Sequence, residues 1–74
     1  NSPFTLQRSD DFAERVRTEA GADPSAQVRR AYQLALSRDP TAEEMTETMP
    51  AVSTHGVSVL CRALFNSNEF LFQP

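Results

Sequence analysis

Apolar side chains recur at helical spacing along most of the chain, most clearly between residues 25 and 37. Apolar positions there fall at i, i+3, i+4, i+7 and i+8, the pattern of one helix face. They are Val28, Ala31, Tyr32, Ala35 and Leu36. Because Arg29, Arg30 and Gln33 fall on the other face, the pattern predicts an amphipathic helix from Ser25 to about Ser37.

A segment nearer the N-terminus predicts another amphipathic helix. Its apolar face consists of Phe12, Ala13, Val16 and Ala20, and charged residues lie mainly on the other side. Ser2 is placed to cap this helix and Pro3 to take its first position. Gly21 predicts its end, and Asp23-Pro24 predicts the start of the next helix after a short loop.

The third predicted helix begins directly after the second. The residue before Pro40 is biased away from helical geometry, so the chain should turn there. Thr41 and Glu44 have the spacing of a capping box, in which each side chain accepts a hydrogen bond from the other residue's amide. We expect Met45 and Met49 to be the main apolar anchors of this polar helix, which should stop near Pro50.

The fourth predicted helix is the most apolar, with only Ser58 and Arg62 forming a narrow polar stripe between residues 57 and 65. It should follow a loop of Ser, Thr and Gly residues and be surrounded on most sides. Its β-branched valines also suit a strand, but the chain offers no second strand to pair with. Residues 66–69 predict a turn before a last helical turn that carries Phe70 and Phe72.

These elements predict an all-α fold, a small bundle of four main helices with a short C-terminal helical turn. At 74 residues the chain is too short for a second core, so residues 1–74 form one domain. The single cysteine cannot close an internal disulfide, and one Cys with one His falls short of a zinc site. We expect the chain to be a C-terminal module excised from a larger protein.

The charge and hydropathy of the chain argue against nucleic-acid binding and against a membrane-spanning segment. Ten acidic residues against seven arginines give a net charge of −3, which provides no overall attraction to phosphate backbones. We therefore expect no nucleic-acid binding. The longest mostly apolar stretch, residues 56–65, is about half of the roughly 20 residues that a membrane span needs.

Few residues are candidates for chemistry. His55, in a predicted loop, has an imidazole that could act as an acid, base or ligand, but no partner spacing supports that role. Cys61 is better interpreted as a small buried apolar residue. Haem-attachment, phosphate-loop and nucleophile-elbow motifs are absent, so we assign no catalytic, cofactor-binding or metal residue and expect no cofactor.

Two charged groups have a functional alternative beside an ordinary one. The acidic group could attract a cation but is better interpreted as a solvated helix face, because it lacks the spacing of a calcium loop. It comprises Asp39, Glu43, Glu44 and Glu47. The basic group, Arg29, Arg30 and Arg38, could bind an anionic partner, although acids elsewhere should cancel its field.

Three stretches together resemble a known group of proteins: residues 1–4, the segment from Ala31 to Glu44, and the segment from Leu60 to Phe72. They are similar to the C-terminal region of large secreted planctomycete proteins of unknown function, which also carry cytochrome-c-like domains. The resemblance implies an exported or periplasmic parent whose haem lies elsewhere. Ser37 departs from the pattern, which has Gly at this turn and thereby favours a left-handed helix end. A looser likeness, to phycobilisome-linker-like protein-binding modules, covers the Tyr32-to-Pro40 segment and the Ser-x-Glu-Phe ending.

Because the resembled proteins have no known activity, the resemblance implies no reaction, and two hypotheses about function remain. In the first, the domain is a non-catalytic interaction or structural module that docks on the rest of its own polypeptide or on another protein, with Phe72 as a contact. In the second, it contributes His55, Arg62 or Glu69 to an active site completed by upstream redox or hydrolytic domains.

Overall fold

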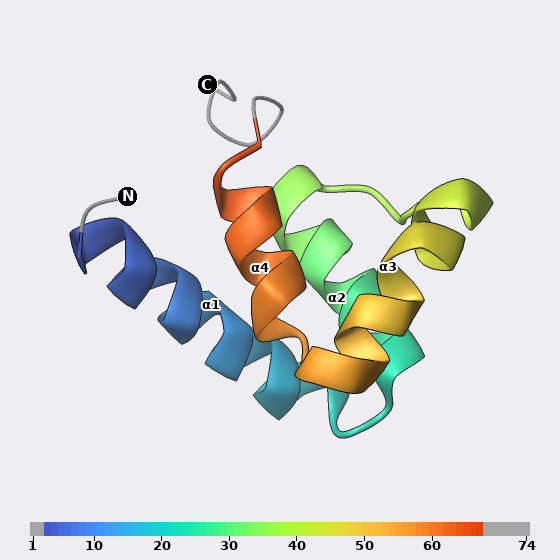
Figure 1. Ribbon diagram of the computed structural model, residues 1–74, viewed down its shortest axis with the longest axis horizontal. Coiled ribbons are helices and arrows are strands. Elements are labelled where there is room, and N and C mark those ends of the chain that lie inside the picture. The colour runs from blue at the N-terminus through green and yellow to red at the C-terminus, as the bar shows by residue number, and fades with distance from the viewer. Residues whose placement is uncertain (1–2, 68–74) are drawn as a thin grey trace.

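The computed structural model describes the backbone of residues 3–67 and the side chains of residues 8–67. Within these residues the chain forms four α-helices and no strand, which confirms the all-α fold (Figure 1). The helices are α1 (Pro3–Ala20), α2 (Pro24–Leu36), α3 (Ala42–His55) and α4 (Ser58–Phe65). The predicted boundaries of α2 and the predicted end of α1 are correct to within one residue. The cap predicted at Ser2 lies outside the described residues.

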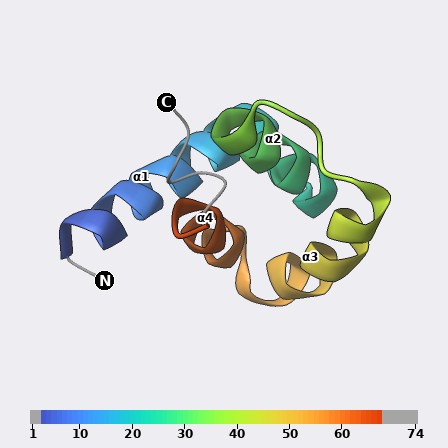
Figure 2. The ribbon, with the colours of Figure 1, turned by 90° about the horizontal axis from the view of Figure 1, so that it is seen from above.

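The short helix α4 lies among the other three helices, as the view from above shows (Figure 2). It packs against α1, α2 and α3, and α2 packs against both α1 and α3. In the part of the chain that the structure describes, α1 and α3 do not pack on each other. The radius of gyration, 11.4 Å, agrees with the roughly 11 Å expected for a folded chain of this length.

The buried core comes mainly from the faces that hydrophobic spacing predicts. It contains Ala13, Val16, Val28, Ala31, Tyr32, Ala35, Leu36, Val52, Val57, Leu60, Cys61 and Leu64. Phe12 of the predicted apolar face and the predicted anchors Met45 and Met49 are only partly buried and pack against this core from its edge. In α3 the buried residue is therefore Val52 rather than either methionine.

The connections between helices depend on backbone geometry that few residues adopt. Gly21 ends α1 with φ +82° and donates its amide to the Arg17 carbonyl at 2.9 Å, as its sequence position predicts. Ser37 ends α2 in the same left-handed region, with φ 58° and ψ 31°, and its amide reaches the Gln33 carbonyl. The left-handed turn of the resembled pattern thus forms here without glycine.

The end predicted for the third helix is wrong, because α3 continues through Pro50 to His55. Proline at this position removes the hydrogen bond that an amide would donate to the Thr46 carbonyl. Thr46 and Pro50 are both exposed, so water can satisfy that carbonyl. The continued helix also buries Val52 at 3 % exposure, and this apolar burial offsets the cost of the proline.

The prediction that α4 is central is correct in its contacts, but one side of this helix is open. Leu60, Cys61 and Leu64 face the core, whereas Arg62 and Ala63 are exposed. After α4 the Asn66 amide reaches the Arg62 carbonyl at 3.1 Å, and the described part of the chain ends one residue later. The predicted last helical turn, with Phe70, Leu71 and Phe72, lies outside the described residues.

Candidate functional site

The residues named for a composite active site are not brought together. His55 is the last residue of α3 and is exposed, so it does not lie in the predicted loop. Arg62 is exposed on α4. Neither side chain has an ion pair with any side chain of residues 8–67. Glu69 lies outside the described residues.

Cys61 is fully buried between helices, as its interpretation as an apolar core residue requires. Burial raises the pKa of its thiol to about 12, with a smaller opposing influence from Arg17. The thiol therefore stays protonated at neutral pH and is a poor nucleophile. No group of three or more His, Cys, Asp or Glu side chains among the described residues is arranged to hold a metal ion.

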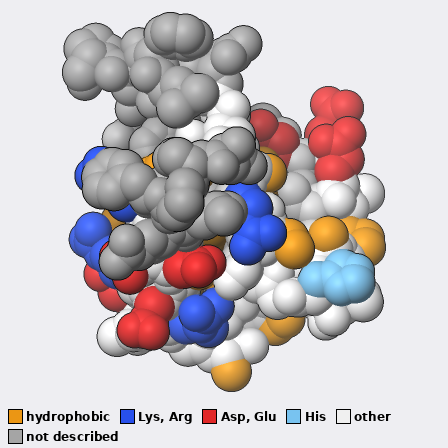
Figure 3. Space-filling view, turned by 60° about the vertical axis from the view of Figure 1, so that its left-hand side comes forward, with side chains coloured by type: hydrophobic (Ala, Val, Ile, Leu, Met, Phe, Trp, Pro, Cys, Tyr) orange, Lys and Arg blue, Asp and Glu red, His pale blue; other side chains and the backbone are white. Residues whose placement is uncertain are grey.

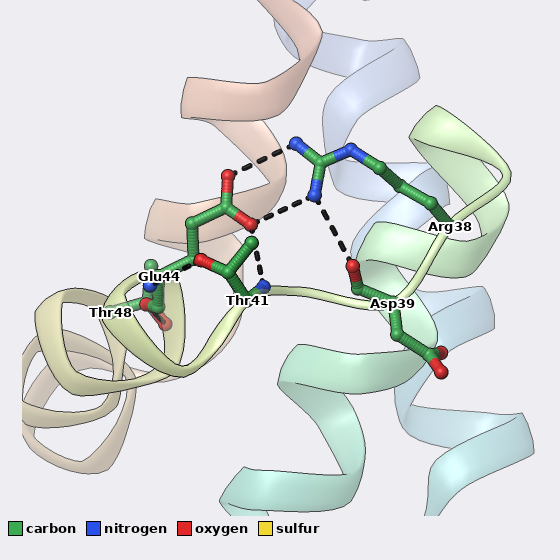
Figure 4. A network of polar contacts seen from close by, with 5 residues as sticks. All are labelled: Arg38, Asp39, Thr41, Glu44 and Thr48. Carbon is green, nitrogen blue, oxygen red and sulfur yellow. Dashed lines mark hydrogen bonds and ion pairs between the residues drawn. The ribbon is translucent and has the colours of Figure 1, made fainter.

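The best-formed polar arrangement joins the end of α2 to the start of α3 (Figure 4). The Arg38 guanidinium donates to both carboxylate oxygens of Glu44, at 2.8 and 3.0 Å, and to the Asp39 carbonyl at 3.2 Å. The predicted capping box is also present. The Thr41 amide donates to Glu44 Oε1 at 2.8 Å, and the Glu44 amide donates to Thr41 Oγ1 at 3.1 Å.

These contacts stabilise the ionised form of Glu44. Hydrogen bonds from Arg38, followed by the bond from the Thr41 amide, lower the pKa of the Glu44 carboxyl from 4.5 to about 2. The same guanidinium lies 5.6 Å from the centre of the Tyr32 ring, within the range of a cation–π contact. Arg38 therefore connects Tyr32 of α2, the Asp39 carbonyl in the turn and Glu44 of α3.

Glu19 has a similar structural role between α1 and α2. Its carboxylate accepts hydrogen bonds from Arg15 at 2.8 Å and from Arg30 at 2.7 Å. Both arginines lower the pKa of the Glu19 carboxyl. Since Arg30 and Arg38 both have acidic partners, the alternative of a basic anion-binding group loses two of its three members. On the left of the face that Figure 3 shows, acidic side chains also lie among the basic ones.

A more promising surface is an apolar groove between α3 and α4, with a volume of about 190 Å³. Ala51 and Ala63 are exposed, Val59 is partly exposed, and Val52 and Leu60 are buried beneath them. We call this the α3–α4 groove; it is lined by Glu47, Thr48, Ala51, Val52, Val59, Leu60 and Ala63. A second hollow of about 310 Å³ lies where α1, α2 and α4 meet, and Arg8, Asp11 and Arg15 line it together with apolar side chains.

Sequence reasoning missed the α3–α4 groove because it ended the third helix too early. A helix that stops near Pro50 leaves out Ala51 and Val52, so the residue spacing predicts no surface between this segment and the fourth helix. A signal was present in Val59 and Ala63, which are four residues apart on one helix face and can line a surface together.

Comparison with known proteins adds no relative: no protein-family model, no curated protein and no solved structure matches this chain. None of the described helices has the combination of length and apolar character needed to cross a membrane.

Proposed function

We propose that this chain is a non-catalytic interaction module at the C-terminal end of a larger exported protein, and that it docks on another part of that polypeptide or on a partner protein. The resemblance to secreted planctomycete proteins supports the exported parent. The α3–α4 groove is the observation that supports docking.

The groove suits docking because its apolar surface is open to solvent. Exposed apolar residues are common when scattered singly, but here the exposed Ala51 and Ala63 and the partly exposed Val59 belong to two adjacent helices and border one hollow. Covering them removes apolar area from water without requiring the core to rearrange. By contrast, the best-formed charged contacts in the described part of the chain bind helices to one another.

The decisive experiment adds the parent polypeptide that lacks this domain to the isolated domain and measures the thermal midpoint of the domain. Docking should raise the midpoint, because a ligand that binds only the native state stabilises it. Ala63→Gln places a bulky polar side chain in the groove and should remove the rise. Ala22→Gln makes the same change on an exposed residue outside the groove and should leave the rise intact.

Two outcomes would contradict the proposal. A midpoint that does not change with up to ~100 μM of the parent polypeptide would exclude docking of useful affinity on the parent. Loss of the parent's activity in His55→Ala or Arg62→Ala, with docking retained, would instead support a composite active site.

A further inference from the structure

We propose that the α3–α4 groove binds a basic amphipathic helix, which places one bulky apolar side chain in the groove and Lys or Arg side chains beside Glu43 and Glu47. This inference rests on the proposed docking function and specifies the chemistry of the partner.

The size of the groove favours a side chain over a small-molecule cofactor. Its volume of about 190 Å³ is well above the ~30 Å³ that one water occupies and below the roughly 300–1,000 Å³ typical of small-molecule sites. A branched or aromatic side chain fits such a hollow. Val59, Leu60 and Val52 offer it apolar contacts and no charged partner.

The exposed walls of the groove suit the approach of a helix. Ala51 on α3 and Ala63 on α4 present only methyl groups, so the backbone of a partner can come close to both helices. Helices that bind in grooves typically insert apolar side chains from one face and keep the other face in water. The two alanines leave room for that arrangement.

Charge identifies the polar face of the partner. Glu47 lies at the groove and Glu43 one helical turn earlier on α3; both are exposed, and neither has an ion pair within residues 8–67. Glu44, between them in sequence, is already paired with Arg38. Two carboxylates without an ion pair in the described part of the chain lie beside an apolar hollow and favour a cationic partner, because complementary charge speeds association and selects among partners.

The same charges make a second copy of this chain a poor occupant. In a symmetric dimer the same patch of both subunits meets, so two sets of Glu43 and Glu47 would approach each other. Arg62 is the only arginine of α3 and α4 to offset them. The net charge of −3 further opposes self-association.

The test uses two synthetic 14-residue helices that share one Leu/Ala face, one with Lys and the other with Glu on the polar face. Each is titrated into the 74-residue chain at low salt, and binding is followed by the NMR shifts of Ala51 and Ala63. The Lys peptide should bind at least tenfold more tightly than the Glu peptide. The double variant Glu43→Gln/Glu47→Gln should weaken binding of the Lys peptide three- to tenfold. Ala63→Gln should also weaken binding of the Lys peptide, but the dependence of its affinity on salt concentration should not change.

Equal binding of the two peptides, or no effect of the double glutamine variant, would overturn the inference. So would shifts of Ala51 and Ala63 that depend on the concentration of the chain alone, because these would indicate a second copy. If neither peptide binds but the parent polypeptide still docks in a way that Ala63→Gln prevents, the docking function stands and only the basic-helix inference fails. If the Lys peptide binds as expected and the parent does not dock, the docking function on the parent fails instead.

Discussion

Ser37 holds a backbone conformation that suits glycine better than serine. Its φ of 58° lies in the left-handed region, where a Cβ atom crowds the following carbonyl at a cost of about 1–2 kcal/mol. Glycine avoids that cost but loses more chain entropy on folding. We therefore expect Ser37→Gly to stabilise the chain by about 0.5–1 kcal/mol in urea unfolding.

Ser53→Gly is the matched control, because Ser53 is exposed within α3 and has ordinary helical geometry. There the same substitution should destabilise the chain by about 0.5 kcal/mol, through the low helix propensity of glycine. If both substitutions change the free energy of unfolding in the same direction, the left-handed geometry of Ser37 does not determine the effect of Ser37→Gly.

The ionised carboxylate of Glu44 makes the stability of the fold depend on pH. Its folded-state pKa of about 2 lies below the ordinary 4.5, so the ionised carboxylate stabilises the fold above pH 4.5. That contribution should be lost as the pH falls from 4.5 towards 2. Because the pair with Arg38 is partly solvent-exposed, this contribution to the free energy of unfolding should stay below about 1 kcal/mol.

Glu44→Gln tests this dependence, because glutamine can still accept the hydrogen bond from the Thr41 amide but cannot ionise. The wild-type chain should be more stable than the variant at pH 7 by urea unfolding, and the difference should shrink between pH 4.5 and 2. Glu47→Gln, which removes an exposed carboxylate beyond the first turn of α3 that has no ion pair within residues 8–67, should show no such trend. A difference that stays constant with pH would refute the role of the Arg38 pair.

At the scale of single residues, the sequence predicted hydrogen bonds within one helix start better than side-chain contacts that cross a turn. The capping box of Thr41 and Glu44 was predicted correctly, because its partners are three residues apart and both belong to one helix start. The bond from Arg38 to Glu44 was missed, because it crosses a turn whose path depends on the left-handed Ser37. Its geometry follows from backbone angles that residue spacing does not reveal.

At the scale of elements, hydrophobic period predicted α2 and most of α1 because their buried faces are regular. Ala13 and Val16, like the five apolar positions of α2, occupy one face and are all buried. The end of α3 was predicted wrongly because proline is a local signal, whereas the burial of Val52 depends on α2 and α4 packing beside it. Tertiary packing there outweighs local preference.

Pro50 should therefore reduce the stability of α3. Pro50→Ala restores an amide that can donate to the Thr46 carbonyl, and it removes the clash of the proline ring with the preceding turn. Allowing for the greater flexibility of the unfolded variant, we expect stabilisation by about 2 kcal/mol and a thermal midpoint several degrees higher.

Pro24→Ala is the control for this substitution. Pro24 is the first residue of α2, where an amide has no partner within the helix, so alanine there should change stability little. If Pro50→Ala leaves the thermal midpoint unchanged or lowers it, then α3 requires the proline to place Val52 in the core.

At the scale of the whole molecule, the four helices do not share the core equally. Six residues of α2 are buried and three of α4, whereas Val52 is the one buried residue of α3 within the described part of the chain. Helix α3 also packs on α2 and α4 but not on α1. Helix α3, which forms one wall of the α3–α4 groove, thus contributes the fewest buried residues to the core within the described part of the chain.

This unequal packing predicts that α3 opens before the rest of the fold. Helices with few buried contacts unfold locally at lower free energy than the global transition. Native-state hydrogen exchange should give amides 46–49 and 51–55, where the helix donates its own bonds, a smaller opening free energy than amides 28–36 of α2. If the α3–α4 groove is a docking surface, a bound partner should slow exchange most in α3, because it adds contacts where the free domain has few. Equal protection of α2 and α3 in the free chain would show that the domain unfolds as one unit, and docking would then stabilise all four helices alike.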